Sequence, residues 1–234
     1  MGYKKPTIFE IYIECFLAPS TLTVSRLFDI VPALKEKGFT DVELQPTFQV
    51  GIGEPSLRPR IRCWSEGRKK LIQLSEDTLI VNLVGEYPGW PAFTELLENA
   101  ASVVASKIGQ FVIASMNLHT IDRFSVPTES YVFDRYVNCG GKIVPEWYKG
   151  SREALDITLG RALVKEDTWN RQIIVRVRRR EPVSIEFRVG LHNVVGSSKR
   201  WKDVLETLHD ESNQVFESLI TDTTRNEIMG GLVE

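Results

Sequence analysis

The stretch "LIQLSEDTLIVNLVGEYPGW", residues 71–90, contains the change of pattern that decides the fold. Short apolar runs separated by polar and glycine-containing clusters are typical of strands joined by tight turns. From Trp90 onward the apolar residues recur with the period of a helix, at Trp90, Phe93, Leu97, Ala100, Val104 and Ile108. We therefore predict antiparallel strands followed by one amphipathic helix.

The same order of patterns occurs twice along the chain. A second helical pattern begins at Trp201, and strand-like runs precede both helices, at 41–50, 58–64, 153–164, 171–180 and 183–195. An apolar sheet face needs cover, and a helix at the end of each meander supplies it. The predicted fold class is α+β, with two pseudo-repeated antiparallel β-meanders, each covered by a Trp-led amphipathic helix. The alternative is that any meander with a covering helix gives this pattern without a repeat.

Two α+β units are expected, at residues 1–110 and 111–234. The segment 123–152 is rich in Pro, Gly and polar residues and forms the natural junction. It also contains six aromatic residues, which favour burial. We therefore expect the two units to pack together as one compact protein.

The composition is that of an ordinary globular protein. The chain has 234 residues, of which 42% are hydrophobic and 26% charged, and its net charge is −2. A near-neutral balance argues against a protein that coats nucleic acid through its overall field, although a local basic patch can still bind it. No apolar run is long enough to span a membrane, and Glu10 and Glu14 interrupt the first one. We expect a cytoplasmic protein of a prokaryotic cell that has no membrane partner.

Residues with catalytic or metal-binding potential are few. Cys15, Cys63 and Cys139 show no CxxC spacing, and the three histidines show no metalloprotease spacing. His119 and Asp122 lack a nucleophile or an orienting partner in the sequence. We therefore predict no catalytic residues, no metal site and no cofactor. We favour a role without catalysis and leave enzymatic activity open.

Two arginine ladders stand out instead. Alternate residues of a strand share a face, so Arg58, Arg60 and Arg62 project together, as do Arg176, Arg178 and Arg180. Lys199 and Arg200 add charge near the start of the last helix. These eight residues are the candidate site for an anion or nucleic acid. The alternative is a solvated face whose charges are paired internally, with Glu181 and Glu186 as partners.

Several segments resemble one known family: "KPTIFEIYIECF", "LIQLSEDTLIVNLVGEYPGW", "VIASMNLHTIDRFSVP" and "LETLHDESNQVFESLIT". The chain resembles a sporadically distributed prokaryotic protein family of unknown function, with a Pro-Pro-Ile-x-Glu-like first strand and a Tyr-Pro-x-Trp turn. Here Lys5-Pro6-Thr7 stands where the family favours two prolines. The turn at Tyr87, Pro88 and Trp90 suits an aromatic placed in the core. A second likeness, in layout only, is to the separately encoded N-terminal and linker subunits of prokaryotic Argonautes.

The resemblance implies a stand-alone protein of defence-related operons. The first hypothesis is a non-enzymatic accessory or interaction protein that acts in a prokaryotic complex. Its expected partner is another protein subunit, and nucleic acid is a further candidate, as for an Argonaute-type partner subunit. The alternative is a small-ligand-binding or enzymatic module with a pocket between a curved sheet and a helix.

Overall fold

The computed structural model of this chain describes residues 3–18, 22–49, 56–108, 111–138, 155–162, 170–178, 182–195 and 200–232. The chain is α+β, as predicted, and it forms two compact units built from segments that alternate along the sequence. The β2–β5 unit contains Glu10–Asn117 and Asn193–Val204. The β7–β9 unit contains Met1–Phe9, Leu118–His192 and Leu205–Glu234. This division interleaves the chain, whereas the predicted boundary at 110/111 cuts it once.

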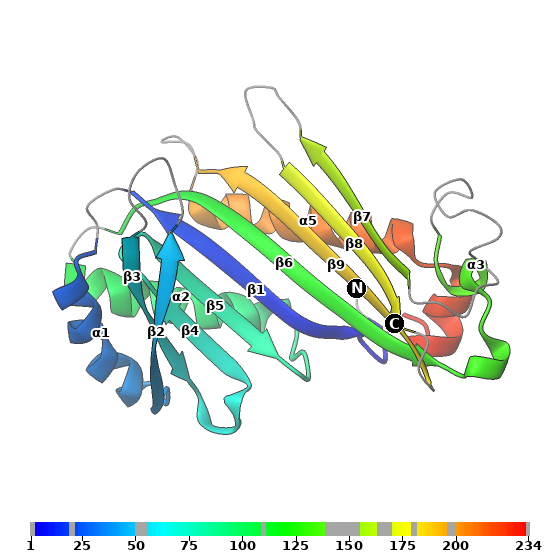
Figure 1. The fold of residues 1–234 in the computed structure, drawn as a ribbon, viewed down its shortest axis with the longest axis horizontal. Helices are drawn as coiled ribbons and strands as arrows, with labels where there is room; N and C mark the ends of the chain where they lie inside the picture. The colour runs from blue at the N-terminus through cyan, green and yellow to red at the C-terminus, as the bar shows by residue number, and fades with distance from the viewer. Residues whose placement is uncertain are drawn as a thin grey trace. The chain divides into compact units, whose positions relative to one another are not determined.

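The β2–β5 unit holds the first predicted meander (Figure 1). Its elements, in chain order, are β1 (Ile8–Leu17), α1 (Val24–Glu36), β2 (Asp41–Gln49), β3 (Ser56–Trp64), the 3₁₀ turn η1 (Glu66–Arg68), β4 (Lys70–Leu74), β5 (Thr78–Val84) and α2 (Trp90–Ile108). The strands pair antiparallel in the order β2-β3-β4-β5-β1. The stretch of residues 71–90 therefore forms most of β4, all of β5 and the first residue of α2.

The β7–β9 unit holds the second meander. Its elements are the last part of β6 (Ile113–Val126), η2 (Thr128–Ser130), α3 (Phe133–Tyr136), β7 (Leu155–Ala162), β8 (Asn170–Arg178), β9 (Val183–Val194), α5 (Trp201–Leu219) and the π-helical turn η3 (Thr224–Ile228). β7, β8 and β9 pair antiparallel in sequence order, and β9 lies next to β6.

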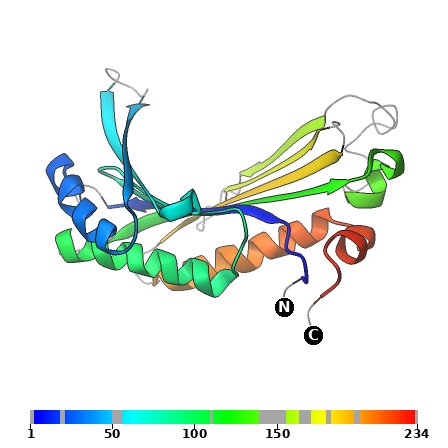
Figure 2. The same ribbon diagram turned by 90° about the horizontal axis from the view of Figure 1, so that it is seen from below.

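In each unit a long helix lies on one face of the strands. Figure 2 shows α2 beneath the strands of the β2–β5 unit, with α1 beside β2 and β3, and α5 beneath the strands of the β7–β9 unit. In α5 the buried residues Leu205, Leu208 and Phe216 face this layer, and the Phe216 ring meets Phe187 of β9 edge to face, 6.0 Å between centroids. The opposite face of each strand layer therefore carries the residues that alternate with the core.

Both long helices begin at a tryptophan, as predicted, at Trp90 and Trp201. Neither ring is placed in the core, however, because both side chains are only half-buried. One turn further along α2, Phe93 is fully buried and its ring lies 5.4 Å from that of Trp90. The expectation that the Tyr-Pro-x-Trp turn places Trp90 in the core was therefore wrong. The internal repeat stays a prediction.

Candidate functional site

Glu186 lies at the centre of the best-defined group of charged residues. It belongs to β9, where Val183, Ile185, Phe187 and Val189 are buried on the face that α5 covers. Glu186 and Arg188 alternate with these residues and therefore lie on the other face. The Glu186 side chain is only 7% exposed, so its carboxylate needs charged hydrogen-bond donors nearby.

Three arginines supply those donors. Arg123 of β6 donates from Nε at 3.1 Å and from Nη2 at 2.6 Å to the Oε2 atom of Glu186. Arg188 donates from Nε to Oε1 at 2.7 Å, and Arg176 of β8 donates from Nη1 to the same oxygen at 3.4 Å. The antiparallel register places Arg176 directly opposite Glu186. One carboxylate thus holds three guanidinium groups from three strands.

The electrostatics of Glu186 follow from these contacts. Burial alone raises the pKa of a carboxyl group, but hydrogen bonds from Arg123 and Arg188 outweigh it and hold the pKa of Glu186 below its usual value. The carboxylate is therefore ionised at neutral pH.

Arg178 extends the group of charged residues around Glu186. It follows Arg176 on the same face of β8 and is exposed. No ion-pair partner of Arg178 occurs among the described residues. We call this set (Arg123, Arg176, Arg178, Arg188 and Glu186) the arginine face, and the register of β7 against β8 pairs Asp156 with Arg176 at its edge. The guanidinium carbon of Arg123 also lies 4.1 Å from the centroid of the Phe9 ring.

The first predicted ladder belongs to β3 of the β2–β5 unit. Arg62 forms an ion pair with Glu43 of β2 at 3.3 Å, and its guanidinium lies 5.1 Å from the Trp64 ring centroid. Arg60 is half-buried, and the Arg58 side chain lies outside the described part of the structure. Arg68 of η1 also stacks on Trp64 and pairs with Asp41 and Glu43. Glu43 thus pairs internally with Arg62, and no acidic partner of Arg60 occurs among the described residues.

The remaining predicted site residues are less informative. Arg180 and Lys199 lie outside the described residues. The Arg200 side chain is 84% exposed and pairs with Asp203 at 3.1 Å. The second ladder is partly paired as well, because Arg176 contacts Glu186, one of the two internal partners predicted from the sequence. Arg123 and Arg188 were not among the predicted site residues. The alternation of Glu186 and Arg188 in "SIEFRV" was a signal for the second of these.

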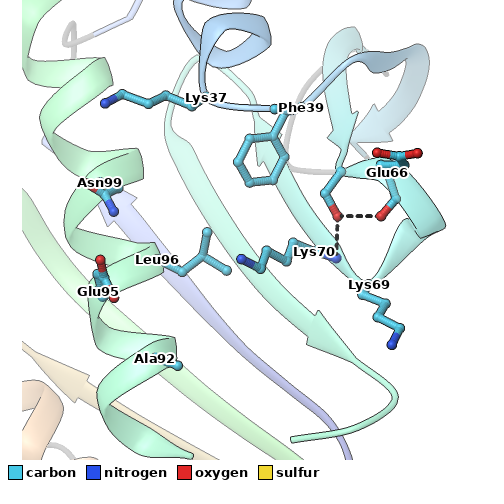
Figure 3. A pocket seen from close by; sticks show the side chains of 11 residues that line it. Lys37, Phe39, Glu66, Lys69, Lys70, Ala92, Glu95, Leu96 and Asn99 are labelled. Carbon is cyan, nitrogen blue, oxygen red and sulfur yellow. Dashed lines mark hydrogen bonds between the residues drawn. The ribbon is translucent and has the colours of Figure 1, made fainter. Parts of the chain in front are cut away.

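A cavity of about 500 Å³ occurs in the β2–β5 unit. It lies between the residues that follow α1, the turn between β3 and β4, and the first half of α2 (Figure 3). Its lining includes the buried side chains of Phe39 and Leu96 and the exposed side chains of Lys37, Lys69 and Lys70.

Other titratable groups are buried without forming a catalytic set. Asp122 accepts a hydrogen bond from the Thr7 hydroxyl at 2.8 Å, and burial raises its pKa to about 7. Burial also raises the pKa of the Cys63 thiol to about 11 and raises that of Cys15 further, so both thiols are protonated at neutral pH. Within the described residues, no group of His, Cys, Asp and Glu side chains is arranged to hold a metal ion.

A scan against models of known protein families found no match, and neither did a search of curated proteins. The family resemblance therefore stays a prediction. In the part of the chain that the structure describes, no helix combines the length and apolar composition needed to cross a membrane.

Proposed function

We propose that this protein is an accessory subunit without catalytic activity that contacts nucleic-acid phosphates through the arginine face. The observation that carries the proposal is the sharing of one buried carboxylate by three guanidinium groups. Glu186 fixes the positions of Arg123, Arg176 and Arg188 and carries one negative charge. A guanidinium has several N–H donors in a rigid fork that matches phosphate oxygens. The exposed guanidinium of Arg178 is the donor group that we expect to bind a phosphate first.

The layout of the charges favours an extended polyanion over a single small anion. Arg176 and Arg178 are two positions apart along β8, a spacing of about 7 Å in a strand. Arg123 and Arg188 lie on β6 and β9 and share the same face. Charges distributed over a strand surface contact successive phosphates, whereas a small-anion site needs donors that converge on one point. The accessory role in a prokaryotic complex follows the family resemblance and supports the same proposal.

Arg178 offers the sharpest test because it is exposed and pairs with no described residue. We expect Arg178→Glu to weaken binding of a fluorescein-labelled oligothymidylate by at least about tenfold, about 1.4 kcal/mol, in an anisotropy titration at low salt. The matched control is Arg26→Glu, which makes the same charge change at an exposed position of α1. We expect the control to change the dissociation constant by less than about twofold.

Two results would overturn the proposal. One is the absence of binding by the unaltered protein to single-stranded or double-stranded DNA and RNA at low salt. The other is an equal loss of affinity in Arg178→Glu and Arg26→Glu, which would assign the effect to overall charge.

A further inference from the structure

The cavity of the β2–β5 unit has an apolar floor and a cationic rim. Phe39 and Leu96 form the floor and are 5% and 7% exposed. Figure 3 shows Lys37 extending toward Asn99 of α2 and Lys70 extending toward Leu96, while Lys69 points away. The Lys70 amine therefore lies beside the floor, whereas the Lys37 amine lies at the edge of the cavity near α2.

These amines have no described partner. No hydrogen bond or ion pair of the Lys37, Lys70 or Asn99 side chains occurs among the described residues. The carboxylates of Glu66 and Glu95 also line the cavity, so three lysines and two glutamates leave a net charge of +1.

The backbone that carries Lys70 is held by the turn between β3 and β4. The Ser65 hydroxyl accepts a hydrogen bond from the Lys70 amide at 3.0 Å (Figure 3). The Ser65 amide donates to the Lys70 carbonyl at 2.9 Å. Gly67 provides the positive φ of 70° that this turn requires. Arg68, also at positive φ, is tied to β2 through Asp41. The base of the lysine side chain is therefore fixed before any ligand arrives.

We propose that this cavity binds a small amphipathic anion, with a single carboxylate or phosphate group at Lys70, an apolar body against Phe39 and Leu96, and Lys37 adding positive charge at the edge. The volume lies in the range of small-molecule sites, which combine apolar walls with a few polar groups. Glu66 and Glu95 disfavour a ligand with several negative charges. The proposal does not depend on nucleic-acid binding, because the cavity and the arginine face share no residue.

The fluorescent probe 8-anilinonaphthalene-1-sulfonate tests this site because it is itself an amphipathic monoanion. We expect saturable binding to the full-length protein, with a dissociation constant that rises at least about tenfold in the double variant Lys37→Gln, Lys70→Gln, since the ionic contact at Lys70 and the nearby charge of Lys37 are both lost. The matched control is the double variant Lys35→Gln, Lys107→Gln, which removes two exposed lysines that do not line the cavity. We expect this control to bind like the unaltered protein.

Competition and blocking experiments complete the test. Octanoate and octyl phosphate should each displace the probe, and the stronger competitor identifies the anionic group, whereas octanol should not displace it. Ala92→Phe, which adds bulk at the cavity wall, should abolish binding while circular dichroism stays unchanged. Equal displacement by octanol, or equal affinity in the two double-lysine variants, would overturn the proposal. If Ala92→Phe loses both probe binding and its helical circular dichroism signal, the variant is misfolded. The comparison of the two double-lysine variants then decides whether the cavity binds the anion.

Discussion

Glu186 separates the structural role of the arginines from their binding role. Replacement by Gln keeps the shape of the side chain but removes the charge that holds Arg123, Arg176 and Arg188. We expect Glu186→Gln to lower the free energy of unfolding by about 2 kcal/mol at neutral pH. This value is below that of a fully buried pair because the arginines are 25–40% exposed and water screens them. Urea denaturation measures the loss.

The effect of this substitution depends on pH with a definite sign. Since the pKa of Glu186 is lower in the folded protein, its stabilisation is complete above the pKa of the unfolded chain and is lost as pH falls through the folded pKa. The difference between unaltered protein and Glu186→Gln should therefore shrink in acid. A difference that stays constant down to acidic pH would show that the charge of Glu186 does not stabilise the fold.

Asp122 predicts the opposite pH dependence. Burial raises its pKa from 3.8 to about 7, so the folded chain keeps a proton that the unfolded chain has lost between these values. Stability should fall as pH rises from about 4 to about 7 and then level off. Asp122→Asn removes this penalty, and we expect it to gain up to about 4 kcal/mol above pH 7 and little at pH 4. Urea unfolding at both pH values measures the gain, and an equal effect at both would contradict the prediction.

At the scale of elements, burial decides which residue attaches α2 to the strands. Phe93 is fully buried, whereas Trp90 is half-buried. We expect Phe93→Ala to cost about 3–5 kcal/mol of unfolding free energy, the usual range for a large aromatic residue in a core. Trp90→Ala should cost less than half as much, because part of its surface is already in water. Thermal and urea unfolding compare the two, and the reverse order would contradict this account of the helix.

The elements, and the shared face of Arg176 and Arg178, could be predicted from local period, but the cross-strand contacts of the arginine face could not. Strand and helix periods depend on neighbouring residues, so the two meanders and the starts of α2 and α5 were accessible to sequence reasoning. The contact of Arg176 with Glu186 depends on the register of β8 against β9. The contact of Arg123 depends on the pairing of a strand more than fifty residues earlier in the chain. Nothing in one sequence specifies such a pairing.

At the scale of the whole chain, segments from distant parts of the sequence complete each unit. The β2–β5 unit takes Asn193–Val204 from the second half, and the β7–β9 unit takes Met1–Phe9 from the first. Tyr3 shows why the N-terminal segment belongs there, because its hydroxyl donates to Glu217 of α5 at 2.6 Å. Patterns of apolar residues along the chain are local and do not show which distant segments pair. They therefore favour units that are contiguous in the sequence.

Charge at this scale also sets how nucleic-acid binding responds to salt. The chain carries a net charge of −2, so we expect attraction to phosphates to come from a local group such as the arginine face. Each phosphate contact with single-stranded DNA contributes about −0.7 to the slope of log K against log salt, so four arginines predict a slope no steeper than about −3. Arg178→Gln should reduce the steepness by about 0.7, while Arg26→Gln should leave it unchanged. Anisotropy titrations over a series of salt concentrations measure these slopes. A much steeper slope would require basic residues outside this face, and an unchanged slope in Arg178→Gln would exclude Arg178 from the contact.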